Sequence, residues 1–288
     1  MAKYILSAFA DEASPALDEQ IRALKEAGVC CVELRGVDGK SVKDLTLDEA
    51  KAVRAKLDAA GIRVSSMGSP FGKIGIEDDF EPHFQEFKHA LELCKILGTK
   101  LMRVFSFYIP AGKDPADFRD EVLRRLTAML DAAVAAGVRL AHENEKGIYG
   151  DIGDRCLDLR EALGDRLGVI FDPANFIQCG QKVDEGYALL KDRITYFHVK
   201  DAIMETGAVV PAGKGDGCVA AVLRDAHASM DGKVFLTLEP HLTVFDGLAA
   251  LEQKGGTYDK LKNVFTYPTN EAAFKAASDA LHEILGSF

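Results

Sequence analysis

The chain has 288 residues with a formal net charge of −10 at pH 7, and 48% of them are hydrophobic, as in globular proteins generally. This acidic balance argues against nucleic acids and anionic membranes as partners, because proteins bind both mainly through Lys and Arg. Its apolar runs stay shorter than the roughly 18 residues of a membrane-spanning helix, and its 6 cysteines show no metal-binding or disulfide spacing, so we expect a cytoplasmic protein with reduced thiols.

Short apolar runs alternate with longer stretches of helical periodicity along the whole chain. The first helix is bracketed by Pro15 and Gly28, in the usual order of proline near a helix start and glycine after its end. Further helices are predicted at 46–60, 80–97, 115–136, 151–163, 183–191, 216–230 and 269–285. Strands are predicted at 4–8, 29–34, 62–67, 100–106, 138–143, 168–172, 194–199 and 233–239.

The pattern amounts to eight strands, each followed by a helix, with no linker-like segment between them. It predicts the α/β class and a single (β/α)8 TIM barrel that forms one domain over residues 1–288. A doubly wound open sheet is the alternative, but it would need a Gly-rich phosphate-binding turn after the first strand, and residues 7–11 (SAFAD) contain no glycine. The longest segments without a predicted element, 205–215 and 241–267, fall on the rim of the barrel where lids lie.

Four consecutive predicted strands end on side chains of types that bind metals. The active site of such a barrel lies at the C-terminal ends of its strands, and strands five to eight end on Glu143, Asp172, His198 and Glu239. A buried carboxylate without a partner is costly, so any one of these residues taken alone would be expected in an ion pair or at a solvated strand end. Three oxygen ligands and one nitrogen ligand, however, suit Mn²⁺, Mg²⁺, Co²⁺ or Zn²⁺, and we expect the four residues to bind one divalent metal ion.

Other polar residues close to the same strand ends are candidates for binding a substrate. They are Arg35, Arg103, Asn175, Lys200 and His241. The two arginines could bind a substrate anion or a structural acid, and Lys200 could hydrogen-bond a substrate oxygen or pair with Asp201. The segment 211–217 (PAGKGDG) precedes a predicted helix and could cradle a phosphate, although an ordinary loop is the other interpretation. His142 is expected to face the helices, because the next residue along the strand faces inward.

The motifs that carry these residues resemble those of the sugar phosphate isomerase/epimerase family, the xylose-isomerase-like TIM barrels that include ketose 3-epimerases. The matching motifs are HENEKG with Glu143, FDPANF with Asp172 and Asn175, HVKD with His198, and LEPH with Glu239. The resemblance extends over nearly the whole chain. It implies that Glu143, Asp172, His198 and Glu239 bind one divalent metal ion, and that the two glutamates serve as catalytic acid and base.

Two departures from the family pattern bear on the substrate. Ketose 3-epimerases carry a histidine near the position of Asn175, and this chain contains no Trp. An apolar wall beside a bound sugar would therefore come from Phe9, Phe71, Phe105 or Tyr108.

The favoured function is a divalent-metal-dependent isomerase or epimerase of a keto-sugar or sugar phosphate. Strands five and eight lie about 135° apart around a barrel of eight strands, so Glu143 and Glu239 would meet a substrate from two sides. One glutamate would remove a proton and one would return it, through an enediolate stabilised by the metal. Burial is expected to raise the pKa of the glutamate that acts as the acid.

A metal-dependent lyase or dehydratase acting on a keto-sugar or cyclitol is the alternative, with His241 as the acid for its leaving group. A third hypothesis is an abasic-site endonuclease, but it would need further His ligands and a basic DNA-binding face, and this chain is acidic. A fourth is a sugar-binding module without activity, and the presence of both glutamates speaks against it. For the isomerase, one or both of the rim segments 205–217 and 241–267 are expected to cover the metal, with an aromatic such as Phe245 or Tyr267 near the substrate or a neighbouring subunit. A lyase would need the same shielding less strictly. A homo-oligomer is compatible with the sequence.

Overall fold

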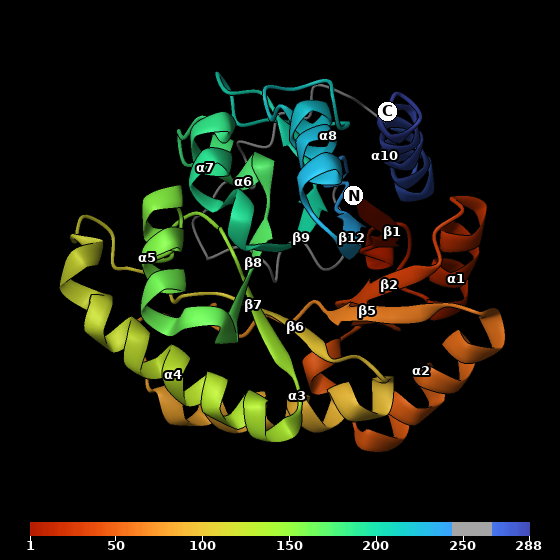
Figure 1. Ribbon diagram of the computed structural model, residues 1–288. Helices are drawn as coiled ribbons and strands as arrows, with labels where there is room; N and C mark the ends of the chain where they lie inside the picture. Colours follow the sequence, from red (N-terminus) through yellow and green to blue (C-terminus); the bar gives the residue numbers. More distant parts are fainter. Residues whose placement is uncertain (244–266) are drawn as a thin grey trace.

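The computed structural model describes residues 1–243 and 267–288 of the chain. Its central element is a ring of eight strands, hydrogen-bonded in the order β1-β12-β9-β8-β7-β6-β5-β2 with parallel pairing, and β2 lies beside β1. Helices surround this ring (Figure 1). The strands are β1 (Ala2–Ala8), β2 (Cys31–Leu34), β5 (Arg63–Met67), β6 (Leu101–Val104), β7 (Arg139–Glu143), β8 (Leu167–Phe171), β9 (Ile194–Val199) and β12 (Gly232–Leu238). The predicted (β/α)8 barrel is therefore confirmed, whereas one domain over residues 1–288 stays a prediction.

The helices of the outer layer follow the predicted order, and their bounds agree with the predicted ones within a few residues. They are α1 (Leu17–Glu26), α2 (Leu47–Ala60), α3 (Phe80–Leu97), α4 (Arg119–Ala136), α5 (Gly153–Leu163), α7 (Val183–Leu190), α8 (Val219–Ser229) and α10 (Asn270–Leu285). Thr46 and Glu49 form a capping box at the start of α2, and Gly61 ends that helix in the left-handed region at φ 74°. This glycine turns the chain back toward the barrel, where β5 begins.

Short elements beyond the strand ends are not predicted by the sequence pattern. They are the hairpin of β3 (Gly36–Val37) and β4 (Lys40–Ser41), the hairpin of β10 (Asp201–Ala202) and β11 (Val209–Val210), and α6 (Pro173–Gln178). Each has too few residues for hydrophobic periodicity to reveal it. Helix α6 begins because the Asp172 side chain accepts a hydrogen bond from the Asn175 backbone N–H at 2.9 Å, and Pro173 fits the first helical position.

Apolar side chains fill the space between the strands and the surrounding helices in one large buried cluster, to which every strand of the barrel contributes. A smaller cluster of Ala141, Ile170 and Tyr196 lies apart from it, inside the barrel. Because side chains alternate along a strand, the residues two positions further on share this inner face. Those residues are the acids and the histidine at the ends of β7, β8 and β9.

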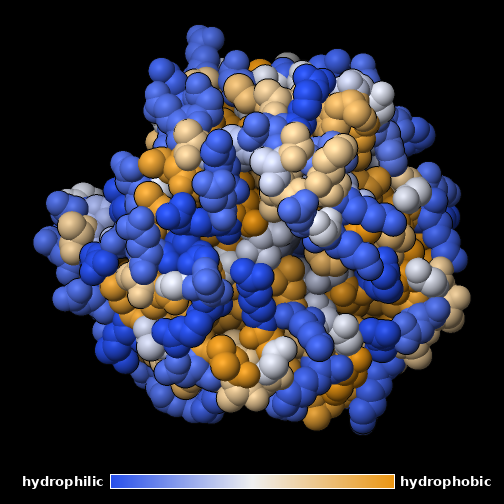
Figure 2. All heavy atoms as spheres, in the orientation of Figure 1, coloured by the Kyte–Doolittle hydropathy of each residue, from blue (hydrophilic) through white to orange (hydrophobic). Residues whose placement is uncertain are grey.

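Helix α10 lies beside α1 and completes the outer layer next to the first helix. On the face that Figure 2 shows, hydrophilic and hydrophobic residues are interspersed. In the described part of the chain, no helix is long and apolar enough to span a membrane.

Candidate active site

Glu143, Asp172, His198 and Glu239 meet at the C-terminal ends of β7, β8, β9 and β12. One donor atom from each residue lies within 4.8 Å of the donor atoms of the other three, and all four side chains are buried. Two atoms that bind one ion at roughly 2.0–2.6 Å cannot be more than about 5 Å apart. The donors are therefore close enough together for a single divalent ion, as the sequence leads one to expect.

His198 lies between acids on both sides of its ring. Its Nδ1 atom is 2.9 Å from Glu143 Oε1 and 3.3 Å from Glu239 Oε2, whereas its Nε2 atom is 3.3 Å from Glu33 Oε2. Burial opposes the charged imidazole, but Glu143 and Glu33 outweigh burial and raise the pKa of His198 well above its ordinary value. The Nδ1 edge of the ring thus points to the two glutamates at the ends of β7 and β12.

The two arginines considered as substrate ligands both pair with acids of the site. Arg103 Nη1 lies 3.0 Å from Glu143 Oε2, and Arg35 Nη1 lies 3.5 Å from Glu239 Oε1. The other guanidinium nitrogens of Arg35 donate to two acids that follow β1, at 2.8–3.0 Å. Each of these arginines was considered as a ligand of a substrate anion or of a structural acid. The described contacts show both of them paired with acids.

Lys200 lies between Asp172 and Glu239, and these two acids, not Asp201, are its partners among the described ion pairs. Its Nζ atom donates to Glu239 Oε2 at 3.2 Å and lies 3.0 Å from Asp172 Oδ2, although without the angles of a hydrogen bond. Burial lowers the pKa of Lys200, but Asp172 and Glu239 outweigh burial and raise it above the ordinary value. The ammonium group is therefore a fixed positive charge beside the cluster.

The neighbouring cations outweigh burial at both glutamates. Burial raises the pKa of Glu143, but His198 and Arg103 bring it down to about 2. Burial also raises the pKa of Glu239, and here Lys200 leads the groups that bring it well below its ordinary value. The net shift is therefore downward for both residues, not upward as expected for the catalytic acid, because each carboxylate has a cation in contact with it.

The pKa of Asp172 is shifted in the opposite direction, and one of its carboxylate oxygens accepts no hydrogen bond from the described residues. Burial raises the pKa of this residue to about 8, with Lys200 opposing the effect. Its Oδ1 atom accepts the Asn175 backbone N–H, while its Oδ2 atom accepts no hydrogen bond from the described residues. A buried carboxylate oxygen normally has a partner, and a cation shared with the other three donors would supply one. The donor set therefore fits a divalent ion.

Asn175 and His241 also lie in the cluster. Asn175 Nδ2 donates to Glu143 Oε1 at 3.3 Å and to a backbone carbonyl at 2.9 Å, so it helps to orient that glutamate. His241 Nε2 lies 3.3 Å from both Glu12 Oε1 and Glu239 Oε1, and its backbone N–H donates to Glu12 Oε2 at 2.6 Å. Both residues are therefore close enough to the four donors to contact a substrate bound there.

Two further buried acids of the site are missing from the sequence-based assignment, namely Glu12 and Glu33. Glu12 lies in a 3-10 turn (Ala10–Glu12) directly after β1, and burial raises its pKa to about 8 although Arg35 opposes this. Glu33 lies near the end of β2. Both follow the signal used for the later strands, an apolar strand that runs into an acid, so the same reasoning could have found them.

The glycine-rich loop 211–217 is occupied by a side chain of the protein itself. The Asp201 carboxylate accepts hydrogen bonds at 2.8–3.0 Å from the backbone N–H groups of Gly213, Gly215 and Gly217. These amides are therefore not turned toward a phosphate, and the ordinary-loop interpretation holds. His142 lies outside the cluster, with its Nε2 atom 2.9 Å from Ser106 Oγ.

Two of the four aromatic residues expected beside a sugar, Phe9 and Phe71, contact different parts of the molecule. The Phe9 ring packs edge-on against the His198 ring, with 5.1 Å between the ring centroids. Phe71 instead packs against Phe87 in the large apolar cluster, with 5.3 Å between the ring centroids. Of these two residues, Phe9 is the one in ring contact with a predicted metal ligand.

The predicted closure of the rim segments over the metal can be compared with the structure only in part. Segment 205–217 contains β11, and its Gly207 carbonyl accepts a hydrogen bond from Gln178 of α6 at 3.2 Å. Phe245 and most of segment 241–267 lie outside the described residues. Tyr267, at the end of that segment, packs against the large apolar cluster. Closure over the metal therefore stays a prediction.

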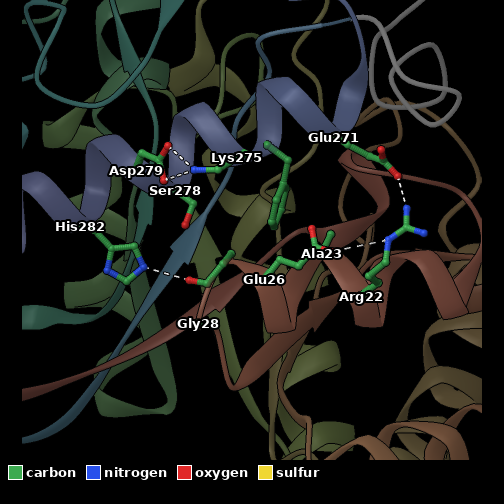
Figure 3. A pocket seen from close by; sticks show the side chains of 11 residues that line it. Arg22, Ala23, Glu26, Gly28, Glu271, Lys275, Ser278, Asp279 and His282 are labelled. Carbon is green, nitrogen blue, oxygen red and sulfur yellow. Dashed lines mark hydrogen bonds and ion pairs between the residues drawn. The ribbon is translucent and has the colours of Figure 1, made fainter.

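A pocket far from the strand ends lies on the outer layer, between α1 and α10 (Figure 3). Arg22 Nη2 and Glu271 Oε1 pair across it at 2.5 Å. Lys275 pairs along α10 with Asp279 at 2.6 Å. Its cations are thus matched by acids of the same two helices, and its lining contains none of the residues predicted for the active site.

Comparison with known families agrees with the fold. A model of the family described as xylose isomerase-like TIM barrel matches residues 21–253. The chain belongs to this family. The match covers β2 through β12, and so it includes all four residues that converge at the ends of the strands of this xylose isomerase-like TIM barrel.

Individual relatives of the xylose isomerase-like TIM barrel are distant. A probable L-ribulose-5-phosphate 3-epimerase (UlaE) of Mycoplasma pneumoniae is 23% identical over 142 residues, which is 49% of this chain and 47% of that protein. The chain thus matches about half the length of this curated relative. Among solved structures, an L-ribulose 3-epimerase has a TM-score of 0.73 at 18% identity, covering 100% of this chain and 95% of that chain. An IOLI protein with a bound zinc atom has a TM-score of 0.72 at 16% identity, covering 99% of both chains.

Proposed function

We propose that this chain is a divalent-metal-dependent isomerase or epimerase of a keto-sugar or sugar phosphate. The observation that carries the proposal is the convergence of four buried donors within 4.8 Å, with Glu143 and Glu239 both near His198 Nδ1. The similarity to an L-ribulose-5-phosphate 3-epimerase and to an L-ribulose 3-epimerase supports a sugar as substrate. The net charge of −10 supports a small-molecule partner over nucleic acid or membrane, and a cytoplasmic location is part of the same proposal.

One divalent ion, Mn²⁺, Mg²⁺, Co²⁺ or Zn²⁺, would be held by Glu143, Asp172, His198 and Glu239. Once bound, such an ion polarises a substrate carbonyl and holds the adjacent hydroxyl, which makes the neighbouring C–H bond more acidic. The zinc atom bound by the similar IOLI protein supports a metal ion in this chain. Lys200 and the two arginines would keep the carboxylates of Glu143 and Glu239 charged and would fix their orientation.

The two glutamates would carry the proton. A glutamate held ionised by Arg103 or Lys200 can take the proton from the carbon next to the carbonyl, and the electron pair of the broken C–H bond moves into an enediolate. Return of a proton by the other glutamate to the opposite face gives the epimer. Return by the same glutamate to the neighbouring carbon gives the isomer. Both reactions leave the mass of the substrate unchanged.

Deuterium incorporation from solvent tests this proposal. The protein with added Mn²⁺ would be incubated in D2O with each member of a panel of ketoses and ketose phosphates, and the products would be followed by NMR and mass spectrometry. We expect one substrate to give an isomeric product with deuterium at a carbon next to the carbonyl. Asp172→Asn, which removes a ligand but no acid or base, should lose the activity together with the metal. Turnover without deuterium in product or recovered substrate would contradict an enediolate.

A metal-dependent lyase or dehydratase is the second candidate, because His241 Nε2 lies 3.3 Å from Glu12 and from Glu239. From there it could donate a proton to a leaving hydroxyl or to a departing carbon. Loss of water or cleavage of the substrate by the wild-type protein, together with an inactive His241→Ala variant, would favour the lyase. A product of unchanged mass formed by an active His241→Ala variant would favour the isomerase.

A further inference from the structure

We infer that Glu33 positions His198 for metal binding by fixing which nitrogen of the imidazole carries the proton. The inference rests on the proposed function, since it concerns the same metal centre. Glu33 comes from β2, on the part of the barrel opposite the strands that carry the four donors, and it is not one of those donors. Its role would be to hold a ligand in the state that binds the ion.

Glu33 is completely buried and contacts three hydrogen-bonding groups from two other strands. Tyr196 Oη donates to its Oε1 atom at 2.9 Å, and Thr237 Oγ1 donates to its Oε2 atom at 2.8 Å. His198 Nε2 lies 3.3 Å from the same Oε2 atom. The carboxylate is therefore held in place from both of its oxygens.

The fixed carboxylate determines the tautomer of the imidazole. A carboxylate can only accept hydrogen bonds, so His198 Nε2 must carry the hydrogen that points toward Glu33. A neutral imidazole has one N–H group, and its other nitrogen then presents a lone pair. That nitrogen is Nδ1, which lies 2.9 Å from Glu143 Oε1 and 3.3 Å from Glu239 Oε2. By the same rule Nδ1 carries a proton toward these two carboxylates as long as no ion is bound, and a bound ion would take the place of that proton. Glu33 thus keeps the other proton on Nε2 and leaves Nδ1 as the nitrogen that is free to bind the ion.

The strands are built to bring these groups together. The register of β2 against β5 shifts between Val32 and Glu33, and irregularities of this kind re-aim a side chain. Thr237 on β12 is the register partner of His198 on β9, so the hydroxyl and the imidazole reach the carboxylate side by side. Tyr196 lies two residues before His198 and therefore on the same inner face of the barrel.

Metal affinity of a charge-matched pair of variants tests the inference. The full chain would be stripped of metal with a chelator and titrated with Co²⁺ alone, followed by calorimetry and by the visible absorption of the bound ion. Glu33→Gln is expected to weaken Co²⁺ binding by about 10–100-fold, as is usual when the carboxylate behind a histidine ligand is lost. Glu145→Gln is the control, because it removes one negative charge from the loop after β7, where Glu145 pairs with Lys73 at 3.0 Å. It should bind Co²⁺ nearly as tightly as the wild-type protein.

NMR that locates the proton on the His198 ring distinguishes a positioning role of Glu33 from a purely structural one. In wild-type protein labelled with ¹⁵N-histidine and loaded with Zn²⁺, NMR is expected to show the His198 proton on Nε2. Glu33→Gln should weaken the hydrogen bond of this proton, and thermal unfolding should verify that the variant is folded. Should that variant fail to fold, Tyr196→Phe keeps the carboxylate but removes one of its two hydroxyl partners, and a smaller loss of Co²⁺ affinity is expected.

The outcomes distinguish this inference from the proposed function. Co²⁺ affinity in Glu33→Gln, or in Tyr196→Phe if that is the folded variant, equal to that of the wild type would overturn the role of Glu33 alone. A wild-type His198 that binds Zn²⁺ through Nε2 would do the same. A wild-type chain that binds neither ion would overturn the metal centre, and the proposed function and this inference would fail together.

Discussion

Arg103 Nη1 lies 3.0 Å from Glu143 Oε2, with both side chains almost completely buried. The contact joins β6 to β7, and Arg103 Nη2 donates as well to the Gly68 carbonyl at 3.2 Å. A buried carboxylate that loses its charged partner keeps the full cost of its desolvation. The charge state of a proposed catalytic base thus depends on this arginine of the neighbouring strand as well as on His198.

Arg103→Met is therefore expected to raise the pKa of Glu143, which burial raises but His198 and Arg103 bring down to about 2. The base must be ionised, so the acid limb of the pH profile of kcat/KM should move to higher pH. The folded state should also lose about 3–5 kcal/mol. Arg125→Met is a control, because Arg125 is equally buried and pairs with Glu121 at 2.6 Å outside the site. It should lower stability and leave the pH profile where it is, and an unmoved profile in Arg103→Met would refute the assignment.

Removal of the metal should abolish turnover, and adding Mn²⁺ back should restore it. His198→Gln is expected to lower the bound metal by at least about tenfold, because it deletes one of four donors. His142→Gln is the matched control, since His142 Nε2 lies 2.9 Å from Ser106 Oγ and outside the cluster. Elemental analysis of both variants checks the prediction. Full activity of the chelator-treated protein would rule out a metal-dependent reaction.

Replacing either proposed acid–base residue should affect the chemical step more than substrate binding. Glu143→Gln and Glu239→Gln are each expected to lower kcat by about 10²–10⁴-fold with a smaller change in KM, because proton transfer occurs only in the transition state. Both residues are also proposed ligands, so metal content has to be measured on the same samples. Glu145→Gln, in the loop after Glu143, should turn over at close to the wild-type rate. A near-normal kcat with bound metal would remove that glutamate from the pair.

The barrel and the convergence of its four donors could be predicted because both depend on local pattern. A strand whose apolar alternation ends on Glu143 or Asp172 indicates where the chain leaves the barrel, and the topology then brings consecutive strand ends together. The sequence position of His198 between those acids and Glu239 completes the set. No contact between distant residues is needed for this argument beyond the barrel itself.

The charge states and the pairing choices could not be predicted, because they depend on contacts between distant strands. Lys200 has Asp201 next to it in sequence, yet its ammonium bridges Asp172 and Glu239. The carboxylate of Asp201 is taken instead by three glycine amides of the following loop. The low pKa of Glu143 likewise follows from His198 and Arg103, which lie on other strands. Sequence spacing ranks none of these partners above the others.

His83 on α3 should make stability fall in mild acid. Its Nε2 atom accepts the Gly72 backbone N–H at 2.9 Å, which only the neutral ring can do, and burial lowers its pKa from 6.5 to about 4. The contribution of His83 is complete above pH 6.5, where neither the folded nor the unfolded state is protonated. It is lost as the pH falls from about 6.5 to about 4, because the unfolded state takes up the proton first.

Urea unfolding measured between pH 7 and pH 4 checks this prediction for His83. The decline in unfolding free energy over that range should be shallower in His83→Gln than in the wild-type protein, because Gln cannot take up a proton. The NMR titration of the His83 ring should give a midpoint far below that of a free imidazole. Equal slopes for the two proteins would show that His83 is not responsible for the acid sensitivity.

Asp201 should hold the loop 211–217 in place through its carboxylate. The N–H groups of Gly213, Gly215 and Gly217 all donate to it at 2.8–3.0 Å, and a Cβ atom on Gly217 would lie 2.5 Å from Asp201 Oδ1, so the loop closes tightly around this side chain. In Asp201→Ala these donors lose their acceptor, and each unsatisfied group costs about 1–3 kcal/mol unless water reaches it.

Hydrogen exchange is the measurement that tests the role of Asp201 most directly. In Asp201→Ala the amides of 211–217 should exchange much faster than in the wild-type protein, and unfolding free energy should fall by roughly 2–4 kcal/mol. Asp216→Ala is the control, because Asp216 Oδ2 accepts a single exposed hydrogen bond, from the Met204 backbone N–H at 2.7 Å. It should change stability little and leave most of the loop protected. Unchanged exchange at Gly213, Gly215 and Gly217 in Asp201→Ala would mean that the loop is held by other contacts, and the phosphate-cradle interpretation of these amides would have to be considered again.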